Sequence, residues 1–203
     1  MTSYKTIRDP RTDHLLTPQN AALLIVDFQP VQVSSIASRD KRQLVANITV
    51  LAQIGKLYRL PTVLSSVNVN TGKNQPTIHQ ITEVLPEIIP VDRTAINAWE
   101  DEDFVTAVKA TGRKKLVFAA LWTEVCLVHP ALDALREGYE VYPVVDCIGG
   151  TTTEAHEVGL RRLEQAGAKL ITWVQLICEL QRDWNRTETV PGFADILFAI
   201  EGH

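Results

Sequence analysis

Short apolar runs alternate with amphipathic stretches along most of this chain. The runs are rich in Val, Ile, Leu and Ala, which is typical of buried strands. The stretches between them place apolar residues every three or four positions, as Leu44, Ile48 and Leu51 do, which indicates helices that pack on a core. This alternation is the pattern of a parallel sheet with helices on both faces. We therefore expect a three-layer α/β/α fold.

Proline and glycine interrupt these patterns and set the expected element boundaries. Pro61 separates the first long helix from the second strand. Gly112, Gly138 and Gly167 each follow the end of a helical pattern. Six strands are expected, over residues 21–28, 62–69, 91–94, 116–121, 140–146 and 169–173. The expected helices cover residues 41–60, 77–85, 100–111, 123–138, 153–166 and 174–184.

The length and composition fit one α/β domain, with 203 residues of which 45% are hydrophobic and 22% charged. We expect a single domain over residues 1–203, with its core in about 18–184 and a C-terminal extension in 185–203. The formal net charge of −4 provides no broad basic surface. We therefore expect neither a nucleic acid nor a membrane surface as a partner.

The sequence carries no sign of secretion or membrane insertion. Residues 1–14 are polar and charged, and no later segment has 18 consecutive apolar residues. The three cysteines, Cys126, Cys147 and Cys178, are too few and too scattered for a disulfide framework or a zinc-ligand pair. Free thiols fit a reducing compartment, so we expect a cytoplasmic protein.

Cys126 is the strongest candidate for a nucleophile. It follows the apolar run 116–121 and a Thr-Glu pair, where the pattern predicts a strand, a sharp turn and a helix. Backbone N–H groups in the first turn of a helix lack intrahelical partners, and the helix dipole is positive there. Both effects favour a thiolate over a thiol, so the position predicts a reactive cysteine.

Two further polar residues end expected strands and could serve this thiol. Ligands of open parallel sheets bind outside the carboxyl ends of the strands, where Asp27 and Arg93 are also expected. A cysteine nucleophile needs a base, and a cation holds that base ionised. Asp27 could instead cap a neighbouring helix or loop. Asp146 ends another strand and is expected to be a local cap or turn residue.

Other residues near these strand ends have simpler explanations. His129 is a rival base, but its ring should point away from a thiol aimed out of the helix start, and Pro130 disturbs the geometry further. Cys147 is a rival nucleophile, although a small buried hydrophobe is the commoner role for such a residue. Cys178 lies in an apolar helical stretch and is expected in the core.

The tryptophans allow two interpretations each. Trp122 either forms a wall of a substrate pocket or packs between strand and helix. Trp99, Trp173 and Trp184 are compatible with an oligomer interface, and core packing explains them equally well.

Several segments carry a resemblance to a known family. Residues 22–29 (ALLIVDFQ), 92–99 (DRTAINAW) and 122–127 (WTEVCL) resemble the three motifs of the isochorismatase-like cysteine hydrolase superfamily. Residues 97–104 (NAWEDEDF) and 171–184 (ITWVQLICELQRDW) are similar to its YcaC-like branch of hydrolases. The similarity extends from about residue 18 to residue 184.

The resemblance implies a triad of Asp27, Arg93 and Cys126 on a six-stranded parallel sheet of Rossmann-like topology. Many members of the superfamily have Lys where this chain has Arg93, and Arg can clamp a carboxylate through two N–H groups. The resemblance also implies a cis peptide bond between Leu121 and Trp122. The N–H groups of Trp122 and Cys126 would then form the oxyanion hole.

The residues after the second strand argue against a metal site. Nicotinamidase relatives bind a metal there through an Asp and several His residues. In this chain residues 65–69 read Ser-Ser-Val-Asn-Val, and His79 is isolated beyond a loop. We expect no metal and no other cofactor.

Together, the residues and the resemblance predict a metal-independent cysteine hydrolase of a small molecule, which cleaves an amide-type C–N bond through a covalent Cys126 intermediate. Two alternatives stay open. One is ether hydrolysis of the isochorismatase type, which does not depend on the cysteine, and the other is a non-catalytic ligand-binding or scaffold protein on the same fold. The resemblance further implies a homo-oligomer, with an octamer as one option.

Overall fold

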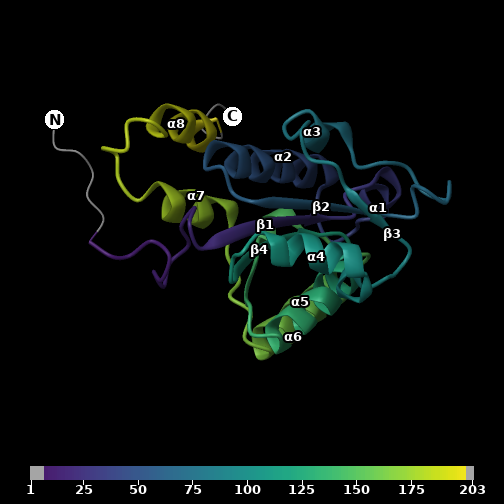
Figure 1. The fold of residues 1–203 in the computed structure, drawn as a ribbon. Coiled ribbons are helices and arrows are strands. Elements are labelled where there is room, and N and C mark those ends of the chain that lie inside the picture. Colours follow the sequence, from purple (N-terminus) through teal and green to yellow (C-terminus); the bar gives the residue numbers. More distant parts are fainter. Residues whose placement is uncertain (1–6, 200–203) are drawn as a thin grey trace.

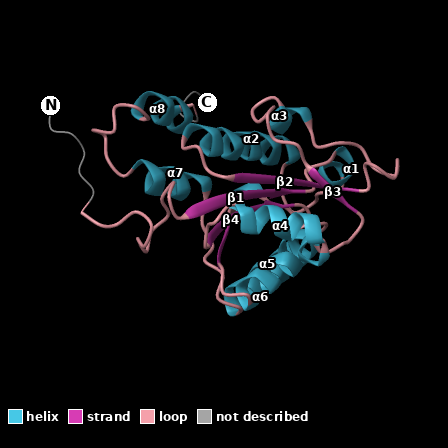
Figure 2. Cartoon of the chain, in the orientation of Figure 1, coloured by secondary structure: helices cyan, strands magenta, loops and turns pink. Residues whose placement is uncertain are grey.

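A five-stranded parallel sheet lies between two groups of helices in the computed structural model, which describes residues 7–199 (Figures 1 and 2). The strand order is β3-β2-β1-β4-β5. The strands are β1 (Ala21–Val26), β2 (Thr62–Val67), β3 (Val91–Arg93), β4 (Lys115–Ala120) and β5 (Glu140–Pro143). The three-layer α/β/α class is confirmed.

The helices cover both faces of the sheet, with α2, α3, α7 and α8 above it in Figure 1 and α4, α5 and α6 below it. Their bounds are α1 (Pro30–Ser34), α2 (Lys41–Leu57), α3 (His79–Thr82), α4 (Glu102–Ala110), α5 (Val128–Arg136), α6 (Thr153–Gln165), α7 (Trp173–Gln181) and α8 (Val190–Phe198). No helix of the described residues is long and apolar enough to cross a membrane.

The central strands are apolar because both of their faces are covered. Every residue of β1 and of β4 is buried, and the two strands pair from Ala21 with Lys115 to Val26 with Ala120. Parallel strands covered on both faces read as continuous hydrophobic runs, and these two do. The paired ends at Val26 and Ala120 bring the loops that follow them to the same edge of the sheet.

The prediction of a sixth strand over residues 169–173 is wrong. The segment runs beside β5 and forms one isolated bridge, between Ile171 and Val144. The N–H groups of Lys169 and Ile171 donate to β5, but Pro143 has no N–H to donate in return, which removes one bond of the ladder. Thr172 then caps the N-terminus of α7, which ends the extended backbone.

The C-terminal extension contains a helix, α8, that the hydrophobic pattern did not predict. Tyr58 at the end of α2 and Thr189 both donate hydrogen bonds of 2.7 Å to the Gln181 side chain, which ties the extension to α2 and α7. Phe193 of α8 is buried against this surface. The single-domain prediction also includes residues 1–6 and 200–203, which lie outside the described residues.

Candidate active site

The site lies at the carboxyl ends of β1 and β4, the two adjacent strands in the middle of the sheet. From β1 the chain continues to β2 and β3 on one side, whereas β4 is followed by β5 on the other. Loops that leave two such strands diverge and open a crevice, which is where ligands of open α/β sheets bind. Asp27 follows β1 directly, and Cys126 follows β4 after a short turn.

Asp27 is completely buried and has an unusual backbone conformation, with φ of 61°. Its N–H donates to Ser65 O at 3.0 Å, and its carbonyl accepts from the N–H of Gln29 at 2.8 Å. Asp is among the few residue types that adopt positive φ at moderate cost. The turn therefore directs the carboxylate across the end of the sheet instead of into solvent.

Arg93, the last residue of β3, clamps this carboxylate. Its two terminal nitrogens each donate to one Asp27 oxygen at 2.7 Å, and both side chains are fully buried. Burial opposes the charge of Arg93, but the hydrogen bonds and charge of Asp27 outweigh it and raise the pKa of Arg93. The bidentate pair fixes the orientation of the Asp27 carboxylate.

β2 supports this pair with polar groups that the sequence did not single out. One of these two Arg93 nitrogens, Nη1, also donates to Ser65 Oγ at 3.2 Å and to the carbonyl of Ser66 at 3.1 Å. The Ser66 hydroxyl in turn donates to the Asp92 carboxylate at 2.8 Å. Two adjacent serines inside an otherwise apolar strand were the available signal.

The turn that carries the nucleophile is a π-helical turn over residues 123–127, instead of the first turn of an α-helix. The Trp122 carbonyl accepts from the N–H groups of both Val125 and Leu127, at 3.2 Å each. The peptide bond between Leu121 and Trp122 is cis, as the resemblance implied. The turn ends where α5 begins at Val128.

Cys126 faces the Asp27 carboxylate and is a neutral thiol in this environment. Burial and the Asp27 charge raise the pKa of Cys126 to about 12, although Arg93 and the Trp122 N–H, which donates to the sulfur, oppose this. The expectation that the turn alone yields a thiolate is wrong, because burial and a nearby carboxylate outweigh the backbone donor. Asp27 is the carboxylate that this thiol contacts.

Trp122 contributes both its backbone and its ring to the site. Its N–H points at the Cys126 sulfur, and its indole Nε1 donates to Ser35 Oγ at 2.7 Å. The ring is partly exposed instead of buried in the core. Of the two interpretations of Trp122, a wall beside the nucleophile fits this position better.

The rival residues lie elsewhere or have structural roles. Within residues 7–199, His129 makes no hydrogen bond to the triad formed by Asp27, Arg93 and Cys126. Cys147 is fully buried, as expected of a small core residue. Cys178 is exposed, so its expected place in the core is wrong: it borders a pocket between α7 and the C-terminal extension.

Asp146 and the remaining tryptophans also find explanations in the fold. The Asp146 carboxylate accepts from the N–H of Trp173 at 3.1 Å, which makes it the cap expected from the sequence. Trp99 and Trp173 are buried, whereas Trp184 is 61% exposed. Of the three tryptophans considered for an interface, Trp184 alone is accessible.

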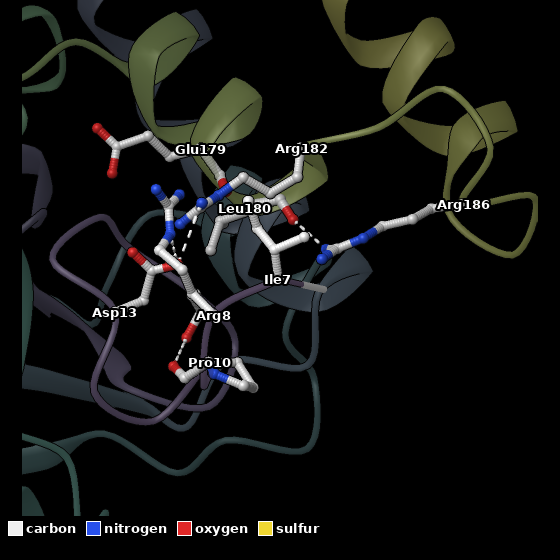
Figure 3. Close-up of a pocket in the computed structure, with 9 residues that line it drawn as sticks. Ile7, Arg8, Pro10, Asp13, Glu179, Leu180, Arg182 and Arg186 are labelled. Atoms are coloured by element: carbon white, nitrogen blue, oxygen red, sulfur yellow. Dashed lines mark hydrogen bonds and ion pairs between the residues drawn. The ribbon is translucent and has the colours of Figure 1, made fainter. Parts of the chain in front are cut away.

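Figure 3 shows a cavity that is unrelated to the triad. Asp13 lies there between Arg8 and Arg182, with ion pairs of 3.1 and 3.2 Å, and Arg186 donates to the carbonyl of Leu180 at 2.7 Å. The cavity measures about 30 Å³, which is room for roughly one water molecule. It is a structural ion-pair cluster between the N-terminal segment and the end of α7. In the described part of the chain, no three His, Cys, Asp or Glu side chains gather as metal ligands would.

The chain is similar in sequence to a known protein family and to several of its members. A family model described as the isochorismatase domain matches residues 21–175. The Escherichia coli protein described as probable hydrolase YcaC is 39% identical over 170 residues, which cover 83% of this chain and 81% of that protein. Isochorismatase domain-containing protein 2A of Mus musculus is 28% identical over 173 residues, covering 83% and 78%.

Solved structures agree with these sequence matches. YcaC from Pseudomonas aeruginosa, solved with hexane-2,5-diol and covalent acrylamide, has a TM-score of 0.81 and 34% identity, covering 94% of this chain and 98% of that one. The E. coli YcaC structure, described as an octameric hydrolase of unknown specificity, has the same score and identity and covers 93% and 97%. Nicotinamidase PncA from Bacillus subtilis, at 17% identity and a TM-score of 0.62, is similar in fold alone, covering 75% and 99%.

Proposed function

Because the chain belongs to the isochorismatase family, and within it to the YcaC-like branch, we propose that this hydrolase is a metal-independent cysteine hydrolase of a small molecule. It cleaves an amide-type C–N bond through a covalent intermediate on Cys126. One observation carries the proposal: the Cys126 thiol faces a buried carboxylate, Asp27, whose two oxygens are both held by Arg93.

In the first half of the reaction, the Asp27 carboxylate takes the proton from the thiol as the sulfur attacks the carbonyl carbon of the substrate. The C–O double bond opens to an oxyanion, which the N–H groups of Trp122 and Cys126 stabilise. When the oxyanion collapses, the C–N bond breaks and the amine leaves with the proton from Asp27. The product on the enzyme is a thioester at Cys126.

In the second half, water replaces the amine. Asp27 takes a proton from the water as its oxygen attacks the thioester carbonyl, and a second oxyanion forms in the same place. Collapse breaks the C–S bond and releases the carboxylic acid, and the sulfur regains its proton from Asp27. Arg93 keeps Asp27 oriented through both halves, because its guanidinium stays charged throughout.

The P. aeruginosa relative supports the covalent step, since its structure contains covalent acrylamide. Acrylamide is an electrophile that thiolates attack. By analogy, we propose that Cys126 is the residue of this chain that such reagents modify. Cys147 is fully buried, and the exposed Cys178 lacks, within residues 7–199, the carboxylate and backbone donor that act on Cys126.

The proposal is tested by incubating the Cys178→Ala protein with a panel of small amides and measuring the mass of peptides that contain Cys126. We expect an acyl adduct on Cys126, and we expect Cys126→Ala to lose the adduct and the hydrolysis of the same amide. Hydrolysis that survives in Cys126→Ala would contradict the covalent mechanism and favour the ether-hydrolase alternative. A wild-type chain that binds the panel without turnover would favour the non-catalytic one.

We further propose that the chain forms a homo-oligomer in the cytoplasm. The E. coli relative is octameric, and Trp184 and Phe198 leave apolar surface exposed on this chain. Light scattering should give a mass that is a multiple of the 22.6 kDa chain. A mass of one chain at micromolar concentration would contradict the proposal.

A further inference from the structure

The segment of residues 149–151 contacts the nucleophile turn at three successive points. Leu121 forms a parallel bridge with Gly149, and the N–H of Thr123 donates to the Gly149 carbonyl at 2.9 Å. The Glu124 carboxylate accepts from both the N–H and the hydroxyl of Thr151, at 2.9 and 2.6 Å. These contacts lie on both sides of Trp122, the residue just before the turn, whose N–H points at the Cys126 sulfur.

We propose that the Gly149–Thr151 segment acts as a clamp that fixes the Trp122 N–H in the oxyanion hole, and that Glu124 is the positioning residue that holds the clamp closed. The inference rests on the proposed function, because an oxyanion develops only if Cys126 attacks an acyl group. It adds a residue, Glu124, that touches neither substrate nor triad.

The Glu124 side chain fits this role because both of its carboxylate oxygens contact the clamp, one through hydrogen bonds and the other through packing. One oxygen receives the two hydrogen bonds from Thr151, which are strong because the acceptor is charged. The other oxygen, Oε2, is buried and has no hydrogen-bond partner among the described residues. A Cβ placed on Gly150 would lie 2.6 Å from this oxygen, so the carboxylate packs directly on the glycine backbone. The turn and the clamp therefore cannot move apart without losing both contacts.

The same segment also fixes the ring of Trp122. The Gly150 carbonyl accepts from the N–H groups of Ala37 and Ser38 at 3.1 and 3.3 Å, and the N–H of Gly150 donates to Ser38 Oγ at 2.9 Å. The short loop held in this way carries Ser35, whose hydroxyl accepts from the Trp122 indole at 2.7 Å. The clamp therefore positions the backbone donor and the wall of the site together.

Glu124 is separate from the groups that control the thiol. Those groups are Asp27, Arg93 and the Trp122 N–H, in addition to burial itself. Loosening the clamp reaches the thiol only through the Trp122 N–H, which is the weakest of these influences. It should therefore impair the step that needs an oxyanion hole far more than a reaction of Cys126 that does not need one. Displacement of iodide from iodoacetamide occurs at a saturated carbon and forms no oxyanion, whereas acylation by p-nitrophenyl acetate does.

The experiment compares these two reagents in the full chain with Cys178→Ala, and mass spectrometry locates each adduct on Cys126. For Glu124→Ala we expect acylation to be about 100-fold slower and alkylation to change by less than about threefold. Glu124→Gln keeps an oxygen that accepts from Thr151, so it should restore most of the acylation rate. Glu164→Ala, which removes an exposed glutamate of α6, is the matched control and should change neither rate.

Thr151→Val is a second variant for the case that Glu124→Ala does not fold. It removes the hydroxyl donor and keeps the backbone N–H, so we expect a smaller loss of acylation, about tenfold, with alkylation unchanged. Equal slowing of both reactions, or of neither, in these variants would overturn the clamp. A wild-type protein whose Cys126 is not acylated by the ester would instead contradict the proposed function, before any clamp variant is compared.

Discussion

Asp27 serves two partners from one buried position. It neutralises Arg93 through two short hydrogen bonds, and it is the group that the Cys126 thiol faces. A carboxylate is stable inside a protein only when such donors satisfy it, so the two Arg93 hydrogen bonds explain how Asp27 can lie at 0% exposure. The sequence identified these three residues through their motifs and expected strand ends. It did not single out Ser65, for which a pair of serines in an apolar strand was the available signal, or Glu124, whose partner Thr151 lies 27 residues further along the chain.

Replacing Asp27 with Asn should abolish amide hydrolysis and make the thiol more acidic. Asn tolerates the positive φ, but it is neutral, so the charge that raises the pKa of Cys126 is removed while Arg93, which lowers it, remains. The pH midpoint of Cys126 alkylation by iodoacetamide should therefore be lower than in the wild-type protein, where burial and Asp27 raise the pKa of Cys126 to about 12. An unchanged or higher midpoint would show that Asp27 does not act on the thiol. Cys178→Ala serves as the background.

Arg93 variants separate charge from geometry in the same pair. Arg93→Met leaves the buried Asp27 without a counter-ion, and we expect it to lower the free energy of unfolding by about 3–5 kcal/mol. Arg93→Lys keeps the charge but offers a point donor in place of two parallel N–H groups, so a smaller loss of about 1–2 kcal/mol is expected. Urea unfolding measures both. Equal losses in the two variants would contradict a role for the charge.

At the scale of elements, the hydrophobic pattern predicted the sheet well and its edges less well. The strands that pair in the middle, β1, β2 and β4, lie where the apolar runs indicated. The last expected strand is reduced to one bridge, because Pro143 and the cap at Thr172 limit its hydrogen bonding to β5. Neither effect changes the pattern of hydrophobic residues from which the strand was predicted. The π-helical turn at 123–127 was also missed. Over only five residues, an α-helical and a π-helical turn have nearly the same pattern of apolar positions, so the sequence does not distinguish them.

The clamp also explains why residue 150 is glycine. A Cβ there would lie 2.6 Å from Glu124 Oε2 and 3.0 Å from the backbone Cα of His156. We expect Gly150→Ala to lower the free energy of unfolding by about 1–3 kcal/mol. Gly192→Ala in α8 is the matched control, because its Cβ would meet only the flexible end of the Leu57 side chain, at 2.8 Å, and alanine favours the helix.

Thermal melting of the two glycine variants measures the difference, and we expect Gly192→Ala to be near neutral. If Gly150→Ala were equally mild, the Glu124 carboxylate could move away from the glycine backbone. The tight packing on which the clamp depends would then be absent.

At the scale of the whole molecule, the chemistry and the C-terminal extension lie at opposite ends of the sheet. Figure 1 shows α7 and α8 at one end and α1 and β3, which flank the triad, at the other. The extension is attached by Gln181 and by an aromatic contact in which Trp184 packs edge-on against Phe193, with centroids 5.1 Å apart. Of the segments that carry the resemblance, residues 171–184 alone reach this end, and they stop before α8, so they gave no information about how residues 185–199 fold.

Because of this separation, we expect that a mutation that destabilises the extension leaves the pKa of the Cys126 thiol unchanged. Phe193 is 4% exposed, and Phe193→Ala should lower the free energy of unfolding by up to about 3 kcal/mol, or less if α8 detaches locally. The pH profile of Cys126 alkylation should stay the same, because no group of α7 or α8 is among those that set its pKa. Urea unfolding and alkylation of the same preparation test both parts. A shifted alkylation profile would show that the extension and the catalytic end of the sheet are coupled.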